Sequence, residues 1–127
     1  MFFQCLMVGI GGFVGASCRF LLSTKVQQLS KSITFPYGTL SVNMLGCLVI
    51  GIICGLVART TIFDISLQNM LIVGFLGGFT TFSTFSYETF SLVKDKMHYL
   101  GMTNILVQVI AGLVLVWSGF LISGVIV

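Results

Sequence analysis

The sequence predicts an all-α integral membrane protein with four transmembrane helices in one domain, residues 1–127. Its composition supports this fold class, since 57% of the residues are hydrophobic and only 7% are charged. The mean hydropathy is +1.13, which is typical of a chain that is surrounded by lipid. The apolar residues also gather in stretches near the roughly 20 residues that a helix needs to cross hydrocarbon. We place the four spans at residues 2–22, 39–58, 67–90 and 100–124.

The connections between these spans are too short to fold as separate units, and they carry basic residues unevenly. The first connection contains Lys25 and Lys31, the third contains Lys94 and Lys96, and the second contains Arg59. Because lysine and arginine concentrate on the cytoplasmic side of membrane proteins, the first and third connections are predicted to be cytoplasmic. Both termini would then lie outside.

The third span contains polar groups that a lipid-facing helix would not need. Five hydroxyl side chains occur within seven residues: Thr80, Thr81, Ser83, Thr84 and Ser86. Hydroxyls cost free energy in hydrocarbon unless they find partners or line a path for something polar. This stretch therefore predicts a functional site.

The same span is predicted to break near its middle. Gly77-Gly78 is followed by Thr80-Thr81, and both residue types form helices poorly, because of glycine's backbone entropy and threonine's branched side chain. A break frees backbone carbonyls, which at membrane depth need protein, water or an ion as a partner. A buried monovalent cation would satisfy them.

Two phenylalanines and an asparagine are candidates for a path that an anion could take. Phe82 and Phe85 lie three apart and share one helix face; such a pair usually packs, but the positive edge of an aromatic ring can also meet an anion. Asn43 in the second span shares a face with Thr39. Its carboxamide either makes a cross-helix hydrogen bond or donates to a passing anion. Ring edges, hydroxyls and an amide could together replace part of the hydration shell of a small anion.

Two charged residues lie within or near the spans. Arg19, near the end of the first span, either reaches the lipid headgroups or stays in the protein and adds positive potential at an entrance for anions. Glu88 is the acidic residue that falls within a span.

Small residues recur at a spacing that brings membrane helices close together. Glycines stand four apart at Gly11 and Gly15, at Gly51 and Gly55, and at Gly74 and Gly78. Four short helices can hardly enclose a pore, so we expect an oligomer with these glycines at its seams. The cysteines are predicted to pack as small apolar residues and not to form disulfides or bind metal: Cys5, Cys18, Cys47 and Cys54.

Three motifs together resemble the Fluc (CrcB) fluoride channel family. They are the glycine-rich stretch that ends at Arg19-Phe20, the pattern Gly38-Thr39-x-x-Val42-Asn43-x-x-Gly46, and residues 74–86. The resemblance covers essentially the whole chain. It implies a passive, fluoride-selective channel of the bacterial inner membrane, not an enzyme, which exports cytoplasmic fluoride and lowers its toxicity. The implied partners are fluoride, membrane lipid and a second copy of the chain in an antiparallel dimer with two pores, and no nucleic acid.

The resemblance also implies roles for individual residues. A sodium ion at the dimer centre would be held by the backbone carbonyls of Gly77 and Thr80. The fluoride path would be formed by Asn43, Phe82, Phe85, Ser83 and Thr84, with Arg19 in the anion vestibule. Further candidates for the pore lining are Gln108, Thr39 and Glu88.

The fourth span departs from the family's pattern, because the family's track of hydroxyl residues appears here as Gly112 and Val116. Gln108 keeps one polar position. Together with the lysine bias, this departure raises the alternative that the chain pairs with an oppositely oriented paralogue. Two other classes also stay open: a small multidrug-type proton-coupled exporter, for which Glu88 would be the embedded carboxylate, and a non-conducting structural membrane subunit.

Overall fold

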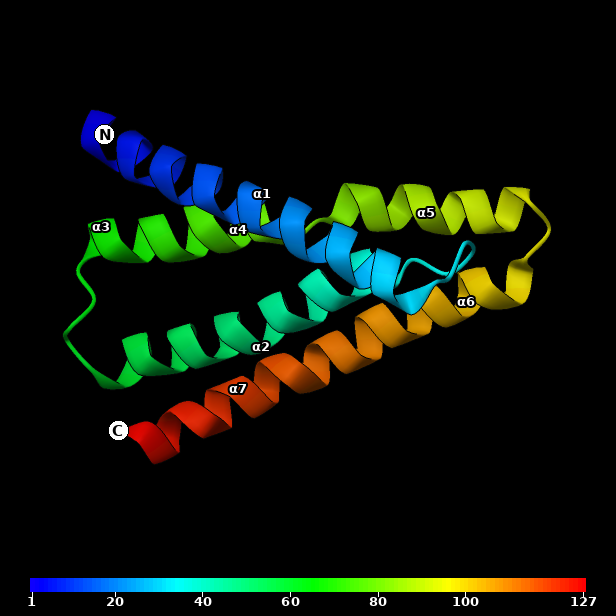
Figure 1. The fold of residues 1–127 in the computed structure, drawn as a ribbon. Helices are drawn as coiled ribbons and strands as arrows, with labels where there is room; N and C mark the ends of the chain where they lie inside the picture. Colours follow the sequence, from blue (N-terminus) through cyan, green and yellow to red (C-terminus); the bar gives the residue numbers. More distant parts are fainter.

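The computed structural model describes residues 1–127 and is built from helices joined by short connections (Figure 1). Four helical stretches are long and apolar enough to cross a membrane: Phe2–Ser30, Tyr37–Arg59, Ile65–Lys94 and His98–Ile126. The predicted all-α fold with four membrane spans is therefore confirmed.

Two of the crossings are single helices and two are composite. The first two are α1 (Phe2–Ser30) and α2 (Tyr37–Arg59). The third comprises α3 (Ile65–Gln68), the π-helical segment η1 (Asn69–Leu76), α4 (Gly77–Phe79) and, after a gap, α5 (Phe82–Lys94). The fourth comprises α6 (His98–Leu106), the π-helical segment η2 (Val107–Ala111) and α7 (Gly112–Ile126).

The crossings run alternately up and down. Both termini lie at one end of the molecule with the α2–α3 connection, and the α1–α2 and α5–α6 connections lie at the other end (Figure 1). α1 packs on η1 and α4, α2 packs along α7, and α5 packs against α6. The two halves of the third crossing thus have different neighbours. The half before the gap packs on α1, and the half after the gap packs on α6.

The helices extend beyond the apolar stretches from which the spans were predicted. α1 continues past residue 22 to Ser30 and ends where Lys31 adopts a left-handed backbone with φ 53°. Its N–H bonds back to the Gln28 carbonyl, a common way for a helix to end. Hydropathy marks where a helix leaves hydrocarbon, whereas the helix itself stops only at a residue that breaks the backbone pattern.

The glycine pairs bring together helices of the same chain. A Cβ atom at Gly15 would collide with the Phe75 carbonyl, and one at Gly51 would collide with the Val116 carbonyl. These contacts join α1 to η1 and α2 to α7. The close helix packing predicted from the glycine spacing is therefore confirmed, but the prediction that these pairs form the seams of an oligomer is wrong, because they join helices of one chain.

The buried apolar side chains gather near the gap in the third crossing. Leu76, Phe79 and Phe85 all flank it and are buried. Phe82, at the start of α5, is by contrast 80% exposed. The core of one chain thus lies against the gap, while one side of the gap stays open at the molecular surface.

Candidate functional site

The predicted break in the third crossing is confirmed, and it falls at Thr80-Thr81. Both residues have extended backbones, with φ −94° and ψ 162° at Thr80 and φ −151° and ψ 120° at Thr81. The Thr81 hydroxyl caps the new helix, because its Oγ1 accepts a hydrogen bond of 3.2 Å from the Thr84 N–H. A threonine at this position stabilises the start of α5.

The glycines before the break stay helical. Gly77 has φ −61° and ψ −36° and begins α4. A Cβ atom at Gly78 would lie 2.7 Å from the Gly12 carbonyl, so this residue allows α4 to approach α1. The chain therefore breaks at the threonines, and the prediction that the glycines help to break it is corrected to a packing role for Gly78.

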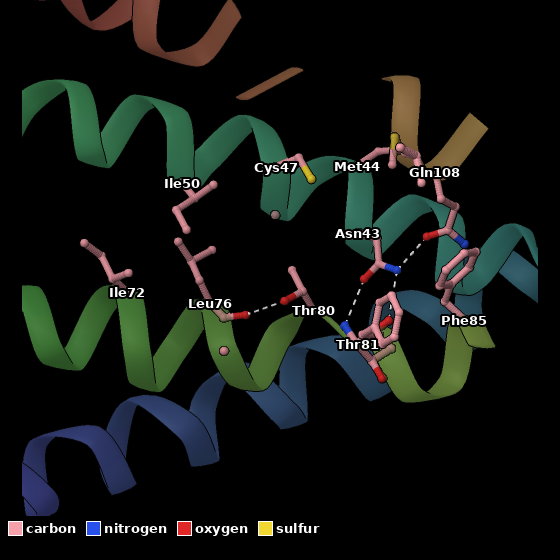
Figure 2. Close-up of a pocket in the computed structure, with 14 residues that line it drawn as sticks. Asn43, Met44, Cys47, Ile50, Ile72, Leu76, Thr80, Thr81, Phe85 and Gln108 are labelled. Atoms are coloured by element: carbon pink, nitrogen blue, oxygen red, sulfur yellow. Dashed lines mark hydrogen bonds between the residues drawn. The ribbon is translucent and has the colours of Figure 1, made fainter. Parts of the chain in front are cut away.

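Asn43 of α2 bonds to both the N–H and the carbonyl of Thr81 at the break (Figure 2). Its Oδ1 accepts from the Thr81 N–H at 2.9 Å, and its Nδ2 donates to the Thr81 carbonyl at 3.1 Å. Nδ2 also donates to Gln108 Oε1 at 2.7 Å. Of the two roles considered for this carboxamide, the cross-helix hydrogen bond is the one formed in the structure.

Gln108 continues the polar contacts from the break into α6. Its Nε2 donates to Asn104 Oδ1 at 3.2 Å, and Asn104 Nδ2 donates to Thr89 Oγ1 at 2.9 Å. Asn104 is 0% exposed and Gln108 is 9% exposed. Sequence reasoning assigned no role to Asn104 or Thr89. The available signal was a pair of carboxamides four residues apart, which share one helix face in an apolar span.

The two phenylalanines line one cavity together with the break and the carboxamides. Their ring centroids lie 5.6 Å apart with an interplanar angle of 60°. The cavity has a volume of about 380 Å³, and its lining includes Phe82, Phe85, Thr80, Thr81, Asn43 and Gln108. The structure therefore brings together the aromatic, hydroxyl and amide groups that the sequence singled out.

Ser83 and Thr84 lie at the surface just past the break. Thr81 Oγ1 is 3.3 Å from Ser83 Oγ and 3.0 Å from Thr84 Oγ1. The buried Thr81 hydroxyl thus links the two exposed hydroxyls of Ser83 and Thr84, which lie next to the exposed Phe82.

Arg19 does not extend toward the headgroups. Its Nη1 donates to the Thr80 carbonyl at 3.2 Å, so the guanidinium lies at the break. The Gly77 carbonyl lacks the N–H that a continuous helix would provide, because the Thr81 N–H is bonded to Asn43. One of the two carbonyls proposed for sodium thus accepts from a cationic side chain, while the other has no helical partner.

A second cavity, of about 750 Å³, lies toward the end with the α1–α2 connection and is lined largely by hydroxyl and amide side chains. Thr39 and Glu88 line it, and Thr39 Oγ1 donates to Glu88 Oε1 at 2.7 Å. The other carboxylate oxygen, Oε2, is buried without a hydrogen-bond partner. Thr39 and Glu88 are thus placed together, apart from the cavity of the phenylalanines.

The fourth crossing has no hydroxyl after Gln108 that faces this site. A Cβ atom at Gly112 would lie 3.3 Å from Cys47 Sγ, and the Val116 carbonyl lies against Gly51. Positions 112 and 116 are therefore used to pack α7 against α2. Gln108 is thus the last polar residue that the fourth crossing contributes to the cavity.

Fold and site together define a small multi-pass membrane protein in which a broken helix and a row of carboxamides form a polar wall within an apolar layer. Residues 6–120 match the family model described as CrcB-like protein, Camphor Resistance (CrcB). The chain belongs to this family.

Several relatives match most of the length of the chain. A protein of Citrifermentans bemidjiense is 40% identical over 120 residues, which cover 94% of this chain and 96% of the relative. One from Geobacter sulfurreducens is 44% identical over 91% of this chain and 93% of its own length. One from Methanococcus aeolicus is 38% identical over 94% of each chain. All three are named fluoride-specific ion channel FluC.

Proposed function

We propose that this protein is a fluoride-selective passive ion channel that exports cytoplasmic fluoride and lowers its toxicity. The names of its relatives and its membership of the CrcB-like family support this function. The single structural observation that carries it is the cavity at the break, where two tilted phenylalanine rings lie beside hydroxyl and amide groups. Permeation through such a path requires no catalytic group.

The chemistry of this cavity suits a small anion. Phenylalanine edges, hydroxyls and amide N–H groups all present positive partial charge. The lining contains no carboxylate, and Glu88 lies in the separate polar cavity. Ser83 and Thr84, on the open side of the break, would supply further donors as the anion passes.

The channel is proposed to work as an antiparallel homodimer in the bacterial inner membrane. The exposed Phe82 and the surface hydroxyls of Ser83 and Thr84 support a partner, because one chain leaves this polar stretch uncovered within the membrane. An oppositely oriented paralogue is the alternative partner, and the lysine bias of the connections favours it.

A structural sodium ion at the dimer centre is part of the proposal. The Gly77 carbonyl fits this role, because Thr81 does not donate to it and carbonyl oxygens are ligands for hard cations. Thr80 fits less simply, since its carbonyl already accepts from Arg19. Two carbonyls from each of two chains would together give the ion more oxygen ligands than one chain offers.

The two other classes lose support. Membership of the CrcB-like family favours a channel over a proton-coupled exporter and over a structural subunit. In addition, one oxygen of Glu88 already accepts from Thr39, so the carboxylate is not free to bind a lipophilic cation with both oxygens.

Efflux from liposomes tests the proposal. The purified chain should release fluoride and retain chloride, and Phe82→Ile and Asn43→Ala should each abolish the release. Two matched controls are Phe90→Ile, an exposed ring on the same helix, and Asn69→Ala, a half-buried carboxamide without a side-chain hydrogen bond; both should conduct. Equal release of chloride, or silence from a folded dimer, would overturn the assignment.

A further inference from the structure

One row of hydrogen bonds connects α5 to the break by way of α6, η2 and α2. Thr89 Oγ1 donates to the Phe85 carbonyl at 2.8 Å, and Asn104 donates to Thr89. Gln108 donates to Asn104, Asn43 donates to Gln108, and the Thr81 N–H donates to Asn43. We call these four side chains, Thr89, Asn104, Gln108 and Asn43, the amide relay.

The direction of every bond in the amide relay is fixed by its two ends. The Thr81 backbone N–H can only donate, so it must meet the oxygen of Asn43, and the Asn43 nitrogen must then face the oxygen of Gln108. At the other end the Phe85 carbonyl can only accept, so the Thr89 hydroxyl points toward it. The carboxamides of Asn104 and Gln108 are thereby held in one orientation.

This orientation decides which group of the Gln108 carboxamide has no hydrogen-bond partner. One Nε2 proton is bonded to Asn104 and Oε1 accepts from Asn43, but the second Nε2 proton has no partner. Gln108 lines the cavity that also contains Phe82 and Phe85. The reversed carboxamide would instead leave an oxygen without a donor, which would repel an anion.

We propose that Asn104 is a positioning residue for anion passage, which holds the Gln108 carboxamide so that a free N–H and not a carbonyl oxygen is available to the cavity. This inference rests on the proposed channel function. Asn104 itself does not line the cavity, so it acts only through Gln108. Because Asn104 is fully buried, any mismatch of donors at this position is costly.

The amide relay itself can be tested without transport. In ¹⁵N-labelled protein in detergent micelles, Asn104→Leu should shift the side-chain amide signals of both Gln108 and Asn43, although Asn104 does not bond to Asn43. Thr103→Val is the matched control, because its hydroxyl bonds only to the Tyr99 carbonyl of its own helix; it should shift neither signal. An unchanged Asn43 signal in Asn104→Leu would overturn the relay.

Transport then tests the positioning role. Gln108→Leu and Asn104→Leu should each slow fluoride efflux by about tenfold, the scale of one lost hydrogen bond to a charged group. The double variant should be no slower than Gln108→Leu alone, because Asn104 has no role once Gln108 is gone. Losses that multiply would instead show two independent roles and overturn the inference.

A second pair of variants covers the case in which Asn104→Leu does not fold. Thr89→Val removes the acceptor for Asn104, whereas Thr89→Ser keeps it. Thr89→Val should shift the Gln108 amide signal and slow efflux, and Thr89→Ser should restore both. If both variants gave the wild-type signal, the inference would be overturned. Wild-type protein that shows the coupled amide signals but conducts no fluoride would overturn the proposed function and leave the relay standing.

Discussion

Asn43 and Thr81 form a two-way backbone clasp, with Thr81 N–H donating to Oδ1 at 2.9 Å and Nδ2 donating to the Thr81 carbonyl at 3.1 Å. Through this clasp α2 takes the place of the helical partners that Thr81 lost when the third crossing broke. A break in hydrocarbon is tolerated when its backbone groups are satisfied in this way.

Asn43→Leu should therefore destabilise the protein as well as block conduction. The Thr81 N–H and carbonyl would both lose their partner, and each such buried group costs about 1–3 kcal/mol. We expect a lower midpoint of thermal unfolding in detergent. Asn69→Leu, on a half-buried carboxamide without a side-chain hydrogen bond, is the control; an equal loss of stability in both variants would contradict the clasp.

Phe82 and Phe85 should respond differently to truncation. Phe85 is buried within one chain and Phe82 is 80% exposed, so Phe85→Ala should lower the free energy of unfolding by about 3–5 kcal/mol. Phe82→Ala should leave the fold of the chain intact and weaken its association with a partner. Thermal unfolding and cross-linking in detergent measure the two effects. The reverse pattern would place Phe82 in the core of a single chain.

Thr81→Val should loosen the first turn of α5. The variant keeps the shape of the side chain but removes the oxygen that accepts from the Thr84 N–H, which costs about 0.5–2 kcal/mol for a helix cap. Hydrogen exchange at the Thr84 amide should become faster in this variant and stay slow in Thr81→Ser. Unchanged protection in Thr81→Val would mean that the hydroxyl does not cap α5.

Arg19→Gln should strengthen the binding of sodium if the ion uses the Thr80 carbonyl. The guanidinium nitrogen lies 3.2 Å from this oxygen, so its charge opposes a cation at the same atom. We expect Arg19→Gln to reach full thermal stability at a lower sodium concentration than the wild type, and Arg19→Lys to behave like the wild type. A higher sodium requirement in Arg19→Gln would show that the arginine assists the ion.

Hydropathy and local composition predicted much of this fold. The four spans follow from apolar stretches of sufficient length, and the break follows from the two threonines, poor helix formers, in the middle of the third span. The C-terminal end of α1 did not follow, because residues 23–30 are mostly polar without being helix breakers. The backbone of Lys31, which ends this helix, has no clear signature in the sequence.

Several residues of the candidate site were predicted from the sequence, including Asn43 and Gln108, which lie far from the phenylalanines in the chain. Phe82 and Phe85 share a helix face by spacing alone, and their meeting in one cavity could be expected. Asn104 meets Thr89 because α6 turns back on α5, and this is a matter of tertiary packing. The prediction of oligomer seams failed for the same reason. The glycine spacing predicts that two helices come close but does not identify the second helix.

The open side of the break also has a consequence for biogenesis. If the proposed dimer forms, a newly inserted chain exposes Phe82 and the hydroxyls of Ser83 and Thr84 to the bilayer until a second copy binds. During this interval the chain would be open to the membrane proteases that degrade misfolded proteins with exposed polar groups. Survival of the chain would then depend on how fast two copies collide, so that the amount of mature protein rises more steeply than the rate of synthesis.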